Sequence, residues 1–448
     1  MPSVAAMEED LGIELFSTSS EGIGGAIKQR EEDFRVEEIP LWTDMGEDAS
    51  GVQNNGPYSV FWLEKRGLDT LLAIKRIAKS LGISQKRLSF AGMKDRNAIT
   101  LQRVSAWKVP AEKLRQVNLS GIQIKDVSQS DVPIRMGSHW GNAFSIIVRG
   151  IPFTVTEAET RIEMVSEEIR SKGGLLNYFG QQRFGLSRPI THIVGLRLLK
   201  GDLRDAAMVF LSKTSPYESD DVRGARAELA ATEDFELAVK RFPVRLSYEL
   251  AMLNKLASDP RNFANAFRAL PRRLLQMFIS AAQSWLFNKF LSERLRRNIQ
   301  LNECVPGDVA SPLDARGLTT NEFFRVEDSN PVELKEQLDS GKAAIVYPVP
   351  GFDMNLPEGV MKEIVREIMD REGIVPRSFW ISMIPETSSA GVFRSIVLIP
   401  KGLKITASCS ETAGVSNARF EFSLVRGGYA TVVLREFMKN DNPLAAGY

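Results

Sequence analysis

Residues 88–107 read LSFAGMKDRNAITLQRVSAW, and the interpretation of the whole chain depends on this stretch. A short apolar run, Leu88–Ala91, leads into a polar loop, Gly92–Asn97, and then into an extended run, Ile99–Trp107. Runs rich in β-branched and aromatic residues that are bounded by turn formers favour strands. We therefore predict two extended segments and, between them, a loop that carries a single carboxylate, Asp95.

The flanking sequence continues this mixture of strands and helices. We expect strands within 26–40, 58–64 and 142–149, and helices across 72–78 and 157–172. Asp69 can cap the first helix and Gly82 can end it. Residues 41–57 are rich in turn formers and are expected to form a mobile loop. The alternation predicts a mixed α/β domain.

The middle of the chain has a different pattern. Residues 175–298 are mostly helical in character, and the apolar residues of 272–297 recur at three- and four-residue steps, which favours a helix packed in a core. Strand-like runs follow at 343–349, 395–399 and 430–434. We infer the first part of one domain over 1–175, an inserted domain over 176–380 and the returning part of the first domain over 381–448.

Composition argues against several kinds of chemistry. The two cysteines, Cys304 and Cys409, lie far apart and in no C-x-x-C motif, and the only histidines are His139 and His192. We therefore expect no disulfide framework, no metal site and no cofactor. No apolar run approaches the roughly 18 residues of a membrane span. The acidic N-terminus does not resemble a signal peptide, so we expect no membrane contact and a cytoplasmic protein.

Positive charge is concentrated in one part of the chain. Between Leu71 and Arg115, eleven lysines and arginines are opposed only by Asp95 and Glu112, which gives a local charge of +9 in a protein whose net charge is +1. Such a separation creates a local positive field, which is typical of nucleic-acid binding. The same pattern is also typical of a solvated helical face.

Asp95 stands between two cations, Lys94 and Arg96. Neighbouring positive charge favours the ionised form of a carboxylate. An ionised carboxylate suits a nucleophile and does not suit a general acid. Gly92, three residues earlier, would let the backbone approach a ligand closely. A bare triplet of this kind is also common in exposed loops, where it forms only salt bridges.

Five separated blocks together resemble the TruD pseudouridine synthases. They are IKQREEDFRVEE (27–38), FAGMKDRNAITLQ (90–102), GNAFSIIVRG (141–150), NYFGQQRFG (177–185) and GGYATVVLREFM (427–438). A looser sixth block, SAAQSWLFNKFLSERL, covers 280–295. The blocks stand in the family's order, and NYFGQQRFG is of uncommon composition. The chain is therefore similar to this family, in its longer archaeal-type form.

The resemblance implies a fold and a reaction. The fold is α+β: a mixed or antiparallel-sheet catalytic domain with an inserted, largely helical α/β domain. The enzyme is an isomerase that breaks the N1–C1′ bond of a uridine in tRNA, by family habit at position 13, and rejoins the base through C5. Asp95 is the implied nucleophile, and attack at C1′, attack at C6 and a glycal route all stay open. Such a reaction needs neither a redox cofactor nor a metal.

The resemblance also implies a set of substrate-binding residues: Lys28, Lys94, Arg96, Asn142, Phe144 and Arg183. Phe144 matches the aromatic ring that stacks on the flipped-out base, and Asn142 matches the amide that lies beside it. Lys28 is assigned to a contact with Asp95 or with a substrate phosphate. Arg183 has the planar donor group that commonly binds phosphate.

Two other functions would use many of the same features. A non-catalytic RNA-binding protein would use the basic cleft and the aromatic residues, but it would have no use for Asp95. A hydrolase such as a glycosidase would need a second, paired carboxylate, and the matched blocks offer one only in Glu31–Asp33. For the isomerase we expect tRNA as the partner and no obligatory protein partner.

Overall fold

The computed structural model describes residues 3–41, 56–320, 322–327, 331–382 and 384–448, so most of the loop expected at 41–57 lies outside the described residues. The chain forms two compact units. The first consists mainly of Thr18–Gly174 and Leu398–Gly447, and the second of Ser3–Ser17 and Leu175–Val397. The boundaries expected from the sequence were 175/176 and 380/381. The catalytic role of the first part and the expected boundaries stay predictions.

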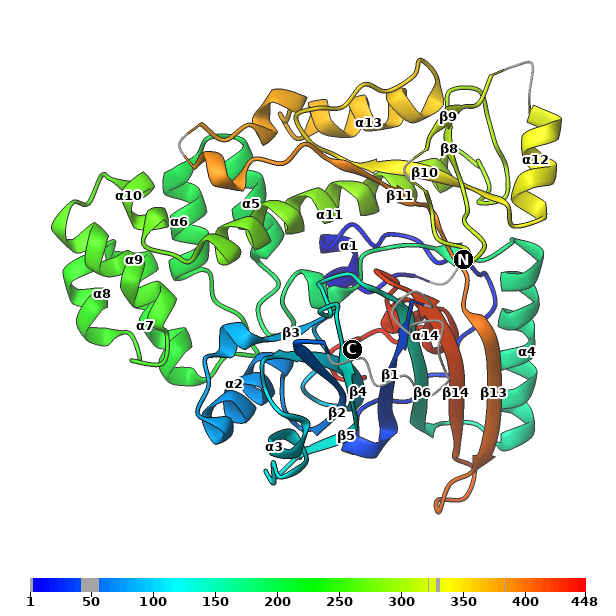
Figure 1. Cartoon of the computed structure of the whole chain (residues 1–448). Coiled ribbons are helices and arrows are strands. Elements are labelled where there is room, and N and C mark those ends of the chain that lie inside the picture. Colours follow the sequence, from blue (N-terminus) through cyan, green and yellow to red (C-terminus); the bar gives the residue numbers. More distant parts are fainter. Residues whose placement is uncertain (1–2, 42–55, 321, 328–330, 383) are drawn as a thin grey trace. The chain divides into compact units, whose positions relative to one another are not determined.

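The first unit is built on one mixed sheet of eight strands. Its order is β13-β14-β6-β1-β4-β2-β5, and β3 also pairs with β4. The strands are β1 (Phe34–Pro40), β2 (Tyr58–Arg66), β3 (Leu88–Phe90), β4 (Ile99–Trp107), β5 (Ile122–Ser130), β6 (His139–Ile151), β13 (Lys401–Cys409) and β14 (Ser416–Val425). The β1–β4 pair is parallel, and the other pairs are antiparallel. The last two strands of the chain therefore complete a sheet that its first part begins (Figure 1).

Helices cover the sheet of the first unit. They are α2 (Thr70–Leu81), α3 (Ala111–Arg115), α4 (Val155–Ser171), α14 (Ala430–Met438) and the short turns η1 (Glu31–Asp33) and η3 (Gln85–Arg87). The predicted start and end of α2 are confirmed: Asp69 accepts a hydrogen bond from Leu72 N–H over 2.8 Å, and Gly82 ends the helix with φ of 65°. One face of α2 packs with β2, β4 and β5 into an apolar core.

The strand expected at 430–434 is wrong, because these residues begin α14. β-Branched residues lose only a few tenths of a kcal/mol in a helix relative to good helix formers. Fully burying each apolar side chain stabilises the fold by about 1.5–3 kcal/mol. Val432, Val433 and Leu434 are all buried in this helix, so packing decides its conformation. The β13–β14 hairpin that precedes α14 was not predicted.

The second unit is largely helical. Its helices are α1 (Ala6–Asp10), α5 (Thr191–Leu199), α6 (Leu203–Ser212), α7 (Asp220–Thr232), α8 (Phe235–Arg241), α9 (Ser247–Ser258), α10 (Phe263–Arg268), α11 (Arg272–Arg296), α12 (Pro331–Asp339) and α13 (Val360–Arg371), with turns η4 (Gln181–Arg183), η5 (Pro376–Phe379) and η6 (Pro385–Thr387). Its strands are β7 (Leu175–Leu176), β8 (Val309–Pro312), β9 (Phe324–Arg325), β10 (Ala343–Val349) and β11 (Val392–Ser395), and β12 (Val397–Leu398) lies at the boundary. The predicted helix at 272–297 and strand at 343–349 are confirmed. The predicted α+β class, a mixed sheet plus a helical insertion, is confirmed as well.

Candidate active site

Three buried side chains, Gln102, Thr70 and Lys65, hold the backbone of the loop around Asp95. The donor–acceptor distances are 3.1 Å from Gln102 Nε2 to the Gly92 carbonyl, 3.0 Å from Lys94 N–H to Thr70 Oγ1, and 2.6 Å from Lys65 Nζ to the Asp95 carbonyl. Gln102 and Lys65 come from adjacent strands, and Thr70 from the start of α2. The loop backbone is therefore anchored, while the Asp95 side chain stays 43% exposed.

Lys28 approaches the carboxylate of Asp95. Its Nζ lies 3.5 Å from Asp95 Oδ2 and 4.6 Å from the centre of the Phe34 ring, and its side chain is only 10% exposed. Lys28 has a left-handed backbone with φ of 56°, which costs roughly 1–2 kcal/mol in a residue with a Cβ. An ion pair to a half-exposed carboxylate returns only about 0–1 kcal/mol. The ion pair alone therefore does not offset the strain of this backbone, and a role for Lys28 at Asp95 stays a prediction.

Lys94 points away from solvent. Its ammonium binds Glu38 Oε2 over 3.0 Å, and both side chains are buried, with exposures of 4% and 1%. Glu38 Oε1 also accepts a hydrogen bond from the Arg103 N–H over 3.2 Å. This pair ties the loop to β1 and β4. A substrate-binding role for Lys94 stays a prediction, and it would require this internal pair to open.

Arg96, on the other side of Asp95, is exposed and forms no ion pair within the described ranges. The two cations that flank Asp95 in sequence therefore differ in kind. Lys94 is a buried anchor, and Arg96 is a solvent-exposed charge next to the carboxylate. Lys28, which is distant in sequence, is the cation that the fold brings to the Asp95 carboxylate.

The GNAF block places Asn142 and Phe144 on one face of β6. The half-buried ring of Phe144 stacks on Phe422 at 5.4 Å and meets the Phe34 ring edge-on at 6.5 Å. Asn142 Oδ1 is buried and has no hydrogen-bond partner among the described residues. Gly141 is required here, because a Cβ at this position would lie 1.9 Å from the Leu424 carbonyl oxygen.

Two rows of paired residues cross this face of the sheet. One row runs Lys65, Thr100, Val36, Phe144 and Phe422. In the next, Leu63 pairs with Gln102 on one side, and Glu38, Asn142 and Leu424 pair on the other. Polar side chains at buried strand positions are uncommon unless they are paired or functional. Lys65, Glu38 and Gln102 are not among the site residues predicted from the sequence. Their signal was a polar residue in phase with the apolar positions of each strand, such as Lys65 after Phe61 and Leu63.

Burial changes the ionisation of two groups near the loop. Burial lowers the pKa of Lys65 to about 8, while Asp95 and Asp69 oppose that shift. Burial, with Lys94 and Arg426, lowers the pKa of His139 to about 4, so this histidine is neutral at pH 7. His139 packs against Gly92, where an added Cβ would lie 3.3 Å from its Cε1 atom.

Arg183 belongs to the second unit, in the NYFGQQRFG block. Its Nε donates to Ser284 Oγ over 3.1 Å, and its guanidinium lies 5.7 Å from the Phe179 ring centre. The side chain is half-buried against α11. In the same unit, burial lowers the pKa of His192 to about 3. Contact of Arg183 with RNA stays a prediction.

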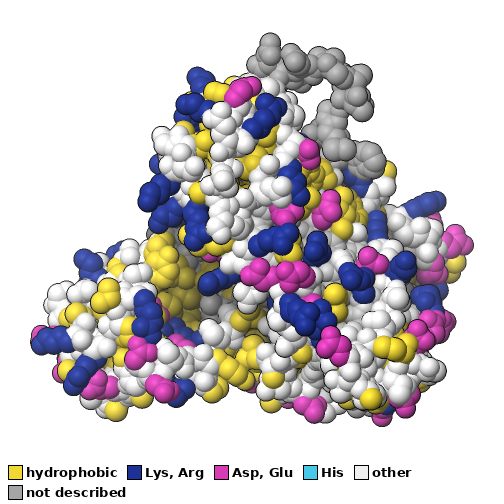
Figure 2. Space-filling model, turned by 90° about the horizontal axis from the view of Figure 1, so that it is seen from below, with side chains coloured by type: hydrophobic (Ala, Val, Ile, Leu, Met, Phe, Trp, Pro, Cys, Tyr) yellow, Lys and Arg dark blue, Asp and Glu magenta, His cyan; other side chains and the backbone are white. Residues whose placement is uncertain are grey.

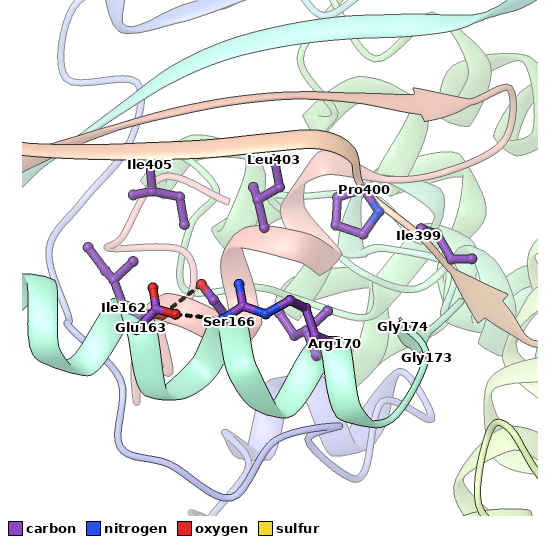
Figure 3. Close-up of a pocket in the computed structure, with 11 residues that line it drawn as sticks. Ile162, Glu163, Ser166, Arg170, Gly173, Gly174, Ile399, Pro400, Leu403 and Ile405 are labelled. Carbon is purple, nitrogen blue, oxygen red and sulfur yellow. Dashed lines mark hydrogen bonds and ion pairs between the residues drawn. The ribbon is translucent and has the colours of Figure 1, made fainter. Parts of the chain in front are cut away.

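A cavity of about 430 Å³ lies between α4 and β13 (Figure 3), on a different part of the first unit from the Asp95 loop. Its walls are mainly apolar, from residues such as Ile162, Ile169 and Leu403. Its two charged side chains, Glu163 and Arg170, pair with each other over 2.5 Å. The predicted site residues do not line this cavity, and it presents no reactive group.

The basic stretch of 71–115 is mostly at the surface. The exposed members are Lys75, Arg76, Lys79, Lys86, Arg96, Lys108, Lys113 and Arg115. Figure 2 shows lysine and arginine side chains interspersed with acidic ones over the face that it displays.

Within the described residues, no three His, Cys, Asp or Glu side chains are placed to hold a metal ion. No described helix combines the length and apolar character that crossing a membrane requires.

The fold is that of a solved protein. It matches the crystal structure of the putative tRNA pseudouridine synthase D (TruD) from Methanosarcina mazei with a TM-score of 0.84, at 35% identity, over 98% of this chain and 99% of that one. This likeness defines the class of protein as a pseudouridine synthase, an isomerase.

Curated relatives agree over the full length. The probable tRNA pseudouridine synthases D of Methanosarcina acetivorans and Thermococcus sibiricus are 36% and 37% identical to this chain, over 98% and 95% of it and 98% and 97% of their own lengths. The sequence profile of tRNA pseudouridine synthase D (TruD) matches residues 10–437. The chain belongs to the TruD family, and the predicted isomerase is confirmed.

Proposed function

We propose that this enzyme converts uridine to pseudouridine at position 13 of tRNA, with Asp95 as the nucleophile. The observation that carries the proposal is the Asp95 carboxylate, which is 43% exposed on an anchored loop and lies 3.5 Å from Lys28 Nζ. A surface that only bound RNA would gain nothing from a negative charge at this position. The relatives' names supply the tRNA substrate.

The proposed reaction conserves all atoms. The N1–C1′ bond breaks, the base turns, and C5 bonds to C1′; the proton on C5 leaves, and N1 gains one. Asp95 assists by attack at C1′, by attack at C6 or through a glycal. In each route Lys28 places a positive charge 3.5 Å from the reacting carboxylate.

Phe144 and Asn142 are the proposed receptors for the extruded base. Removing a base from its stack costs a few kcal/mol, and stacking on an aromatic ring returns about 1–3 kcal/mol. Phe144 is half-buried and backed by Phe422, so its ring is held in one orientation. Asn142 Oδ1 is buried and has no partner among the described residues. A rotation of this side chain toward the base would let the oxygen accept a hydrogen bond from N3–H of uracil. Cytosine lacks that hydrogen, so this contact favours uracil.

The test is substitution of Asp95 in the full-length protein. Asp95→Asn and Asp95→Ala should bind unmodified tRNA transcript like the wild type and form no pseudouridine when the product is mapped at single-nucleotide resolution. Asp131→Asn, which alters another exposed aspartate of the same unit, is the matched control and should keep the wild-type rate.

Three outcomes would contradict the proposal. Product formed at the wild-type rate by Asp95→Ala would remove the nucleophile. Tight tRNA binding without any product in the wild type would favour the non-catalytic RNA-binding function. Release of free uracil would identify a hydrolase.

A further inference from the structure

Lys65 is a buried cation beneath the reactive loop. Its side chain on β2 has no exposed surface, and its Nζ donates to the Asp95 carbonyl oxygen over 2.6 Å. It occupies the inward position that follows Phe61 and Leu63, where an apolar residue would suit the core. Burying an ammonium without a paired carboxylate is unfavourable. The fold therefore gains no stability from this lysine in return for its burial.

The charges around Lys65 belong to the elements that carry the site. Asp95 and Lys94 face it from the loop, and Asp69 faces it from the start of α2. Lys94 is neutralised by Glu38. On the neighbouring strands the paired residues are Thr100 and Ile122, which carry no charge. Asp95 is therefore the reactive group that contacts this ammonium. Lys28 contacts the Asp95 carboxylate, and Lys65 contacts the Asp95 backbone carbonyl.

We propose that Lys65 is a positioning residue for the isomerisation: its buried ammonium fixes the backbone of Asp95 and supplies the reacting carboxylate with a second positive charge from beneath. This inference rests on the proposed function, because it assumes that Asp95 reacts. A displacement of about 1 Å in a reacting group can lower a rate about 100-fold. The hydrogen bond from Lys65 is the contact that holds the backbone of the proposed reacting residue.

The first test replaces the charge and keeps the volume. Lys65→Met should lower the single-turnover rate of pseudouridine formation about 100-fold, leave the tRNA Kd within about twofold, and leave the thermal midpoint unchanged or raised. A merely structural lysine would instead lower the midpoint and spare the rate per folded molecule. Lys125→Met is the control, because Lys125 lies on the adjacent strand and pairs with Glu64 over 2.7 Å, away from the loop. It should keep the wild-type rate.

The second test uses pH. Burial lowers the pKa of Lys65 to about 8, so its positive charge is present below that pH and is lost above it. The wild-type single-turnover rate should therefore fall as pH rises through about 8. The control Lys125→Met should show the same fall. In Lys65→Met the fall near pH 8 should disappear, and only the titration of uracil itself at higher pH should remain.

A third measurement covers the case in which Lys65→Met does not fold. In Lys65→Ala, which leaves a cavity, added propylamine should restore part of the rate at pH 7, while 1-propanol, which fills the space without charge, should not. A wild-type rate in Lys65→Met, a fall near pH 8 that persists in that variant, or equal rescue by both additives would overturn the inference. Absence of product in the wild type would instead overturn the proposed function.

Discussion

The 92–97 loop of the first unit and the 177–185 block of the second are both dense in polar residues, but they use them differently. In 177–185 the polar groups are bound within the unit: Asn177 binds Arg394 and Ser395, the Tyr178 hydroxyl pairs with Ser292, Phe179 N–H donates to Asn288, Gln181 donates to Glu8, and Arg183 donates to Ser284. In the loop, internal partners hold the backbone, and the Asp95 carboxylate is left 43% exposed beside one lysine. An unusual motif can therefore have a structural or a chemical role. The two roles differ in whether its polar side chains are bonded within the fold or exposed to a ligand.

The largest effect is expected at the anchor of the loop. Lys94→Met leaves the Glu38 carboxylate buried without its cation, which should destabilise the protein by roughly 3–5 kcal/mol. Thermal and urea unfolding would measure it. The double variant Lys94→Met with Glu38→Met should regain most of that loss, because neither charge is then left unpaired. A single variant as stable as the wild type would show that the loop is not anchored through this pair.

Removing a contact that holds the 177–185 block should affect stability alone. Asn288 is buried, donates to the carbonyls of Leu11 and Phe179 and accepts from Phe179 N–H. Asn288→Ala leaves these buried groups unsatisfied and should destabilise the protein by roughly 3 kcal/mol. The rate per folded molecule should stay within about twofold in single-turnover assays. Asn254→Ala, at an exposed asparagine on α9, is the control. Loss of activity in fully folded Asn288→Ala would show that this residue also serves the reaction.

Substitution of Lys28 should lower the rate without lowering stability. Lys28→Met removes the cation 3.5 Å from Asp95, and losing one such electrostatic contact should lower the single-turnover rate about 10- to 100-fold. Its unfolding free energy should change by less than about 1 kcal/mol, because the carboxylate is half-exposed. Lys28→Gly should also lose activity but gain stability, since glycine accepts the positive φ without strain. Loss of stability in both variants would make Lys28 part of the scaffold.

The smallest effect is expected at the surface of α2. Replacing the exposed Lys75, Arg76 and Lys79 by glutamine should weaken tRNA binding and reduce the slope of log Kd against log salt by up to about 2–3. Filter binding over a series of salt concentrations would measure both. The single-turnover rate at saturating enzyme should not change. An unaltered slope would show that the basic stretch is a solvated face.

Local sequence signals predicted much of the first unit. The capped helix from Asp69 to Gly82 and the strand 99–107 are present at the expected residues, because cap chemistry and β-branched runs act locally. The family resemblance pointed to Asp95, Lys28, Asn142 and Phe144, and the structure brings Lys28 to Asp95. Their chemical roles stay predictions.

The remainder depended on partners that are remote in the sequence. The ATVVL run has the composition of a strand but begins a helix, which packs on α4 and, through Phe437, on Phe420 of β14. Lys94 reads as a surface cation until β1 places Glu38 beside it. Lys65, Thr70 and Gln102 bond to the 92–97 loop only because the fold brings β2, α2 and β4 together at this loop. The local periodicity marks Lys65 and Gln102 as polar residues at inward strand positions, but it does not show which groups they pair with.

The split of the sheet between the two ends of the chain has a consequence for synthesis on the ribosome. β6 leaves the ribosome early, but its neighbour β14 is made only after the whole of the second unit. An exposed strand edge is a template for aggregation, so the nascent enzyme carries one such edge through most of translation. The helical second unit, rich in local contacts, can fold during that interval. A pause or truncation before residue 416 should therefore yield a product that depends on chaperones to stay in solution.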